Sequence, residues 1–261
     1  MMRYVSNAGI VLKQDKTSIG IDCFCRDSDH LYRDTPDEVC RELLQEIQEG
    51  QLQALIFTHE HSDHFCAEHV KEACGRNADL QVLAGQKAIQ ILRKEGIPEG
   101  QLQEIKPPCE KIFGEIQVEF IETLHEGEKY ADVQNLTLLI KKAGQGATGE
   151  NNNSIEDKYL VITGDAAPTP ELFKQIGQWS KRVDWLLAPF PYVGLRTTRK
   201  LLCDNLDIQN IFVLHQPRQE ADTQNWVANT KKVCEQAKDN LPIPIFPDQS
   251  EYIKEISLDK R

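Results

Sequence analysis

Residues 55–65 read LIFTHEHSDHF, a short apolar run that changes abruptly into three histidines, a glutamate and an aspartate. The apolar run belongs to the segment 52–57, which predicts a buried strand. His59 and His61 follow it and are two residues apart, so an extended backbone directs both side chains to the same side. This pair therefore predicts one half of a metal site.

The same stretch continues with Asp63 and His64, where the chain turns into the next predicted helix. A helix N-terminus carries partial positive charge, which disfavours imidazolium and keeps a histidine ring there neutral and able to bind a metal. One ion can take the histidine pair, and a second ion can take Asp63 and His64. The alternative is a solvated loop that carries histidines by accident.

Three further candidate ligands each follow a predicted apolar strand. These are His125 after the strand 115–124, Asp165 after the strand 159–163, and His215 after the strand 208–214. Loops converge on an open site at the carboxyl ends of strands in α/β architectures. Five of the seven histidines are explained in this way. The pattern favours a metal site over core histidines and an N-cap aspartate.

Helix and strand signals alternate along the 261 residues and predict one α/β domain, residues 1–261, without internal repeats. A hairpin of strands at 5–12 and 17–24 opens the chain. Thr35-Pro36-Asp37-Glu38 is typical of a capping box, with Pro36 at the first helical position. The polar, glycine-rich segment 144–158 predicts a hairpin loop rather than a domain linker.

The remaining predicted elements alternate in the same manner. Further strands are expected at 80–84, 135–142, 183–188 and 252–256, and helices at 67–74, 86–95, 197–205, 222–238 and after the Thr169-Pro170-Glu171 cap.

Composition narrows the choice of partners and compartment. The formal net charge of −11 argues against general binding to nucleic acid or to an anionic membrane. No apolar run approaches the roughly 20 residues that span a bilayer, and the first residues lack the apolar core of a signal peptide. The expectation is a cytoplasmic protein. Its eight scattered cysteines are expected to be reduced thiols, since Cys23-x-Cys25 has no matching second pair.

The motif H-E-H-S-D-H at 59–64, followed by His125, Gly164-Asp165 and His215, closely resembles that of the metallo-β-lactamase-fold hydrolases. The likeness extends from Ser6-Asn7-Ala8-Gly9 through His215. It implies a four-layer αββα sandwich with a two-metal site at one edge.

Carried over by position, the resemblance implies a ligand set. The first metal would be held by His59, His61 and His125, the second by Asp63, His64 and His215, and Asp165 would bridge the two. Asp22 matches a family aspartate that braces the metal loop, although an ordinary turn residue explains it equally well.

The chain departs from the family in one place. Many relatives carry a glycine before the third histidine and a small-residue turn after it, whereas this chain has Thr123-Leu124-His125-Glu126-Gly127. This argues against a glyoxalase II or a true β-lactamase. The segment APFPYVGLRTTR, residues 188–199, looks more like the small ascorbate-6-phosphate-lactonase-like branch.

Imidazole and carboxylate ligands suit zinc, with manganese or iron as alternatives. Two such ions about 3.5–4 Å apart share a bridging hydroxide near neutral pH. With two aspartate ligands and the hydroxide, the centre keeps a net charge of about +1, which attracts an anionic or carbonyl substrate. The expected function is a dinuclear hydrolase of a small ester, lactone or phosphoester, in which Asp63 orients the hydroxide and relays a proton.

Three other classes of function use related sites. A phosphodiesterase or RNA-processing nuclease has the same ligands but usually carries an added nucleic-acid domain or arm, for which this chain has no room. Flavin-partnered di-iron relatives replace the second histidine with glutamate, whereas position 61 is histidine. A non-catalytic metal-binding protein would be favoured by a missing ligand, and none is missing.

Substrate-binding residues are expected on the loop after the strand 183–188. Pro189 and Pro191 stiffen this loop, and Tyr192 and Arg196 are expected to reach into the mouth of the site, where a guanidinium would favour a carboxylate or phosphate. The alternative is that Arg196 only caps or solvates the following helix. Cys66 is expected to pack inside its helix, and His69 is expected to be solvated. His30 lies in a polar stretch with no partner motif, and neither histidine is a site candidate.

Overall fold

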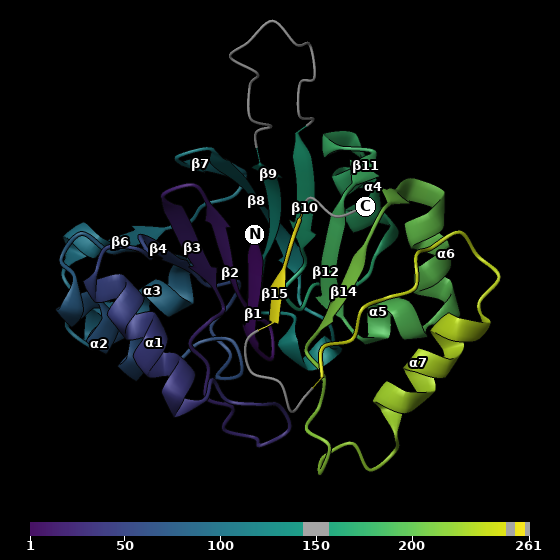
Figure 1. Ribbon diagram of the computed structural model, residues 1–261, viewed down its shortest axis with the longest axis horizontal. Helices are drawn as coiled ribbons and strands as arrows, with labels where there is room; N and C mark the ends of the chain where they lie inside the picture. Colours follow the sequence, from purple (N-terminus) through teal and green to yellow (C-terminus); the bar gives the residue numbers. More distant parts are fainter. Residues whose placement is uncertain (143–156, 249–253, 259–261) are drawn as a thin grey trace, which may run out of the picture.

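Apolar strands form two large sheets in the computed structural model, which describes residues 1–142, 157–248 and 254–258 (Figure 1). The seven-stranded sheet runs, in spatial order, through β15 (Lys254–Ile256), β1 (Met2–Ser6), β2 (Gly9–Gln14), β3 (Thr17–Ile21), β4 (Ala54–Ile56), β5 (Gln81–Ala84) and β6 (Leu102–Glu104). The six-stranded sheet runs through β14 (Ile211–Leu214), β12 (Trp185–Pro189), β10 (Lys158–Ile162), β9 (Gln134–Lys142), β8 (Ile116–Leu124) and β7 (Cys109–Phe113). A small parallel pair joins β11 (Arg182–Val183) to β13 (Asp207–Ile208).

Helices cover the outer face of each sheet, on opposite sides of the molecule in Figure 1. The first sheet carries α1 (Asp37–Gln48), α2 (Ala67–Arg76) and α3 (Gln86–Lys94), and the second carries α4 (Pro170–Trp179), α5 (Pro191–Gly194), α6 (Arg196–Asn205) and α7 (Trp226–Gln236). Two short 3-10 turns, η1 (Glu99–Gln101) and η2 (Glu128–Tyr130), complete the described helices. The predicted αββα sandwich is therefore confirmed.

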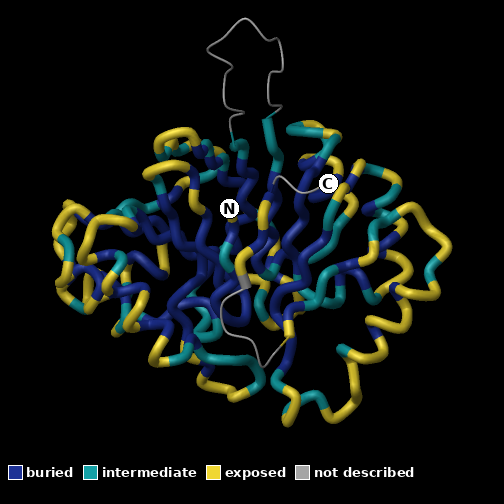
Figure 2. Tube along the Cα trace, in the orientation of Figure 1, coloured by how far each residue is buried: buried dark blue, intermediate teal, exposed yellow. Residues whose placement is uncertain are grey.

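Continuous apolar strands fit this arrangement because each sheet is buried on both faces. Neighbouring residues of β4 show the principle: Ile56 packs in the core between the sheets, whereas Leu55 packs under α1–α3. Leu187 and Leu186 of β12 divide in the same way between the central core and the helices of the second sheet. Figure 2 shows the sheets as the most deeply buried part of the chain.

Two predictions near the N-terminus were wrong. The segment 5–12 is two strands rather than one, because the chain turns at Asn7, whose φ is +44°, and β1 pairs back onto β2. The capping box is absent, since α1 begins at Asp37 without a side-chain cap. Thr35 instead donates its hydroxyl to the carbonyl of Cys23 and accepts the N–H of Cys25.

The second half of the chain also differs in detail from the prediction. The segment 191–194, expected to be loop, forms α5, and β6 and β7 were not predicted at all. Most of the segment 144–158 lies outside the described residues, as do residues 252 and 253 of the last predicted strand, 252–256. Among the described residues no helix combines the length and apolarity that crossing a membrane requires.

Candidate metal centre

One carboxylate ties the loop after β4 to the end of β3. Asp22 accepts the backbone N–H of Thr58 at 2.8 Å and the Thr58 hydroxyl at 2.7 Å, and it lies 2.8 Å from Nδ1 of His64. Its exposure is only 1%. Because Nδ1 of His64 is engaged by a carboxylate, the opposite nitrogen, Nε2, is left for another partner. The bracing contacts that the resemblance implied for Asp22 are thus present.

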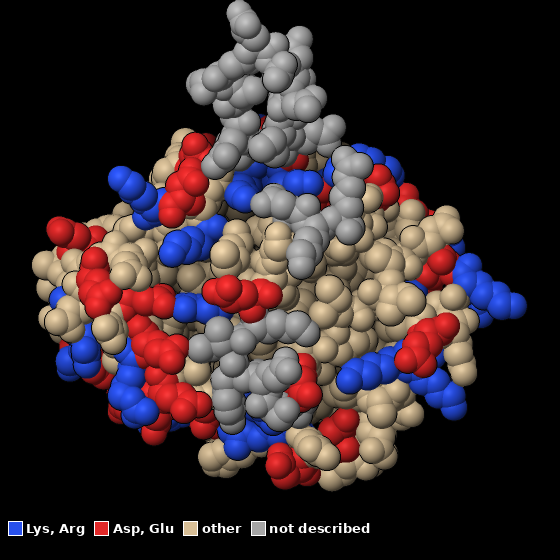
Figure 3. Space-filling model, in the orientation of Figure 1, with Lys and Arg blue, Asp and Glu red and all other residues tan. Residues whose placement is uncertain are grey.

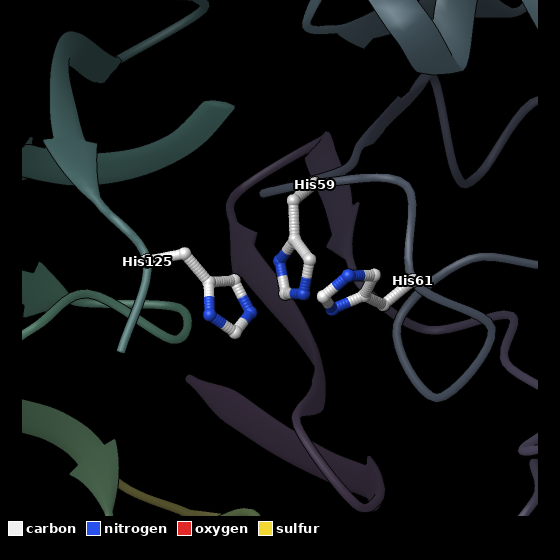
Figure 4. A group of neighbouring side chains, drawn as sticks. All are labelled: His59, His61 and His125. Atoms are coloured by element: carbon white, nitrogen blue, oxygen red, sulfur yellow. The ribbon is translucent and has the colours of Figure 1, made fainter. Parts of the chain in front are cut away.

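Three histidines on two elements face one another (Figure 4). His59 and His61 come from the loop after β4, and His125 comes from the end of β8. Their ring centroids are 4.7–4.9 Å apart in all three pairs. Nδ1 of His125 donates to the carbonyl of Glu126 at 2.7 Å, and Nδ1 of His59 lies 3.0 Å from the Thr58 hydroxyl, so both rings direct Nε2 elsewhere. One potential ligand atom from each histidine falls within 4.8 Å of the others.

A second group lies beside the first and consists of Asp63, His64, Asp165 and His215, again with ligand atoms within 4.8 Å of one another. Nε2 of His215 is 2.8 Å from Oδ2 of Asp63 and 3.2 Å from Oδ2 of Asp165. Nε2 of His64 is 3.3 Å from Oδ1 of Asp165. Asp165 is also 3.7 Å from Nε2 of His125, so its carboxylate lies between the two groups.

Backbone geometry fixes the position of Asp165. The preceding residue, Gly164, has a φ of +53°, and a Cβ there would come within 2.9 Å of Cβ of Thr58. Only glycine fits this close approach without strain. Asn135 of β9 accepts the N–H of Asp165 at 2.9 Å and donates to the carbonyl of Thr163. The carboxylate is therefore held rigidly at the sheet edge.

Four buried atoms of these residues have no hydrogen-bond partner within the described part of the chain: Nε2 of His59, His64 and His125, and Oδ1 of Asp165. Nε2 of His64 and Oδ1 of Asp165 lie 3.3 Å apart but are not aligned for a hydrogen bond. An unsatisfied buried polar group costs about 1–3 kcal/mol, so four at one point need a physical reason. Divalent metal ions supply that reason, because imidazole nitrogens and carboxylate oxygens are their usual ligands. The residues present fit a two-metal site.

Electrostatics prepare both groups for a cation. Burial lowers the pKa of His59 and of His61, so both rings stay neutral. Burial acts to raise the pKa of Asp63 and of Asp165, but the nearby histidines, His64 and His215, lower both, so the carboxylates stay ionised. Burial likewise acts to lower the pKa of His64, yet the surrounding carboxylates of Asp165, Asp63 and Asp22 raise it, so their charge outweighs the helix N-terminus that was expected to keep this ring neutral. The second group thus attracts positive charge strongly.

Neither expected substrate residue lies in these two groups. Tyr192 is buried in α5, with 2% exposure, and its hydroxyl donates to the carbonyl of Ala166 at 2.6 Å. Arg196 begins α6 and lines a separate pocket of about 560 Å³ with Arg199 and Lys200. The reason is that the segment after β12 forms a helical turn over the outer face of the sheet. Tyr192 supports the backbone beside Asp165, and nothing in this placement supports contact with substrate by either residue.

The structure also places the cysteine and the two histidines that the sequence analysis set aside as ligands. Cys66 is buried at the N-terminus of α2 and belongs to neither group, and all eight cysteines are free. His30 is exposed and belongs to neither group. His69 was wrongly expected to be solvated: it is half-buried, with Nδ1 3.9 Å from Sγ of Cys40 and its ring 5.8 Å from that of Phe24.

Two tyrosines beside the centre were not predicted. The ring of Tyr32 lies 3.8 Å from that of His215, and the ring of Tyr130 lies 4.8 Å and 4.7 Å from those of His61 and His125. Asn7 was also missed: its side chain donates to the carbonyl of Asp63 at 2.7 Å. Tyr32 and Tyr130 follow no predicted strand end and belong to no spaced motif, so no sequence pattern marks them. Asn7 lies directly after β1, in the stretch Ser6-Asn7-Ala8-Gly9 where the family likeness begins, and that position was the available signal.

Comparison by sequence finds no matching family model and no matching curated protein. Comparison by structure does find similar proteins. An isothiocyanate hydrolase from Delia radicum gut bacteria is 16% identical, with a TM-score of 0.68 over 98% of this chain and 100% of that one. The metallo-beta-lactamase fold protein YhfI from Bacillus subtilis is 15% identical, with a TM-score of 0.58 over 89% of this chain and 92% of that one.

A third similar structure has a different named activity. CmlA, a diiron beta-hydroxylase from Streptomyces venezuelae, is 16% identical, with a TM-score of 0.54 over 82% of this chain and 44% of that one. The same architecture thus occurs in proteins with different reactions, so activity has to be argued from the residues of the site.

Proposed function

We propose that this chain, which has the metallo-β-lactamase fold, is a metal-dependent hydrolase of a small ester, lactone or phosphoester. It would use two divalent metal ions, and we propose zinc for both. The cluster of four buried, partnerless ligand atoms carries the proposal. Two divalent ions bound here would activate water near neutral pH and polarise the bond to be cleaved. The hydrolase neighbour of similar length supports this choice, and the histidine at position 61 favours it over di-iron chemistry.

The chain's own residues have distinct roles in this proposal. His59, His61 and His125 hold one ion, His64 and His215 hold the other, and Asp63 and Asp165 add carboxylates to the second ion, with Asp165 placed between the two. Asp63, whose carboxylate is 2.8 Å from Nε2 of His215, is the residue placed to accept a proton from the attacking water and pass it to the leaving group. The nearby His64 and His215 lower its pKa, so the carboxylate stays ionised and can both bind a cation and orient the attacking water.

A small-molecule substrate fits the surface better than nucleic acid. The protein has a net charge of −11, and on the face shown in Figure 3 acidic and basic side chains are interspersed rather than gathered into a basic field. A nucleic-acid site needs several basic side chains that track the phosphates. Substrate assays test the two remaining alternatives. One is a nuclease activity, and the other is the lactonase-like activity suggested by residues 188–199.

The test combines metal content with an assay panel. Elemental analysis of zinc-supplemented protein should give close to two ions per chain, and a lactone, a thioester and bis-p-nitrophenyl phosphate should identify the bond cleaved. His61→Ala should lose about one ion and nearly all activity, because the first group has only three ligands. His30→Asn, a change at an exposed histidine, is the matched control. Protein without metal after supplementation would refute the proposal.

A further inference from the structure

A pocket of about 560 Å³ lies between α6 and the end of α7, and none of the residues that line it belongs to either metal group. Arg196 and Cys203 line it from α6, and Val233 lines it from α7. Both helices lie on the outer side of the second sheet (Figure 1). Pockets that bind small molecules commonly measure about 300–1,000 Å³, so this one has room for a ligand.

Positive charge gathers around this pocket although the whole chain has a net charge of −11. Among the described residues that line it, four side chains are cationic and one, Asp239, is anionic. Arg199 already engages that carboxylate through two hydrogen bonds, at 2.7 Å and 2.6 Å. Lys200 lies 2.6 Å from Asp204 and is also paired. The other two cations therefore decide which charge the pocket can bind.

These two cations are Arg196 and Lys238, and both are exposed. Within the described part of the chain, neither side chain has an ion pair or a hydrogen bond. They belong to different elements, because Arg196 is the first residue of α6 and Lys238 follows the last residue of α7 by two positions. A guanidinium and an ammonium offer only donors, so both suit the oxygens of an anion.

Apolar surface accompanies this charge. Val233 lines the pocket and is 41% exposed, and the half-buried Ala237 lines it as well. An inorganic anion would contact the cations and leave Val233 in water. An organic anion would also cover the apolar wall, and burial of apolar surface would add to its affinity. The pocket therefore suits a ligand that has one anionic group and an apolar body.

We propose that this pocket is a second ligand site, separate from the metal centre, for a small organic anion. Its carboxylate or phosphate group contacts Arg196 and Lys238, and its apolar part covers Val233. The sequence analysis expected Arg196 to recognise such a group at the mouth of the metal site, and the placement of this residue moves that recognition to the pocket. The inference needs neither metal nor turnover, so it does not depend on the proposed hydrolase function.

The binding test measures dissociation constants by calorimetry on the zinc-loaded full chain. Octanoate and octylphosphonate carry the two kinds of anionic group on similar apolar chains, and octanamide is their uncharged match. At least one anion should bind about fivefold more tightly than octanamide, because its contacts are charge-assisted but partly exposed to water. Arg196→Gln combined with Lys238→Gln should abolish this preference. Arg41→Gln combined with Lys94→Gln, which removes the same charge from exposed positions of α1 and α3, should keep it.

A chemical readout shows where the anion binds. Cys203 lines the pocket as a free, half-buried thiol, so a bound ligand should slow its alkylation by iodoacetamide several-fold. Mass spectrometry follows this reaction, and Cys109, a free thiol of the same exposure class that does not line the pocket, is the internal control. Protection of Cys203 should persist in His61→Ala, because the pocket lies apart from the metal groups.

Each outcome supports the inference or overturns it. Binding of one anion only, with protection of Cys203, supports it and identifies the group as a carboxylate or a phosphate. Failure of both anions to bind, equal binding of octanamide, or an equal loss of preference in the two double variants would overturn it. Binding that leaves Cys203 unprotected, or that disappears in His61→Ala, would place the anion at the metal centre and overturn it as well.

Discussion

The carboxylate of Asp22 holds the backbone of Thr58, the hydroxyl of Thr58 and Nδ1 of His64 at the same time. Asp22→Asn replaces one acceptor oxygen with an NH₂ donor, so His64 or Thr58 loses its partner. Changes behind a metal ligand typically cost 10–100-fold in metal affinity. We expect that loss for Asp22→Asn, measured by zinc competition with a chelator of known affinity. Asp79→Asn, at an exposed loop position, should leave the affinity unchanged; an equal loss in both variants would contradict the bracing role.

At this scale, the residues brought together at the centre were predictable and those around them were not. The seven candidate ligands are encoded locally, by spacing within the stretch 59–64 and by position at strand ends, and the structure brings all seven together. Tyr32 reaches the centre through a loop with no regular pattern, so only tertiary contacts place it. Tyr192 and Arg196 were expected at the mouth of the site, and the structure places neither of them in the two metal groups. A strand end indicates where a loop begins but not the direction in which it continues.

Elements were predictable where apolar periodicity is strong. The alternation in β8 marks a strand with one face in the central core, and the apolar run of β12 marks one buried on both faces. The edge strand β7 was missed because its side chains are only half-buried or exposed. The capping box at Thr35 failed because a tertiary partner, the backbone of residues 23–25, competes successfully for the hydroxyl.

The packing of α5, α6 and the segment after α7 depends on one ion pair. Arg199, with a side-chain exposure of 4%, makes two hydrogen bonds to Asp239, at 2.7 Å and 2.6 Å, and one to the carbonyl of Val193. Asp239→Asn leaves this guanidinium buried with a weaker partner, so we expect the free energy of unfolding to fall by roughly 1–3 kcal/mol. This loss is smaller than that for breaking a fully buried pair, because Asp239 is partly exposed. Asp204→Asn, which breaks the exposed pair with Lys200, should cost under about 0.5 kcal/mol.

The same pair predicts a pH dependence with a definite sign. The hydrogen bonds from Arg199 lower the pKa of Asp239 in the folded protein below its ordinary value of 3.8. The stabilisation is therefore fully present above about pH 4 and is lost as pH falls through the lowered folded value. In urea unfolding, the difference between wild type and Asp239→Asn should be constant from pH 7 to pH 5 and should shrink below pH 4. A difference that grows on acidification would contradict this assignment.

At the scale of the molecule, the order of elements predicted one α/β domain, and the αββα sandwich was predicted from the resemblance carried by the motif at 59–64 and its later partners. The sequence did not reveal how the two sheets share the site. His59, His61, Asp63 and His64 come from the first sheet's loop, whereas His125, Asp165 and His215 follow strands of the second. Each metal group contains residues from both sheets, so metal ions bound there would join the two halves.

Metal removal should consequently destabilise the whole molecule rather than one loop. A ligand present at 100 times its dissociation constant stabilises the folded state by about 2.7 kcal/mol, and 1 kcal/mol shifts the melting temperature of a domain this size by about 2–4 °C. We expect EDTA to lower the melting temperature by about 5–10 °C, and zinc to restore it. His61→Ala should respond less, because its first group lacks one of three ligands and holds metal weakly even before EDTA. A different result would contradict this prediction: EDTA removes two ions per chain, and the melting temperature of wild type does not change. The bound ions would then not join the sheets, and the four buried ligand atoms without a hydrogen-bond partner would need another explanation.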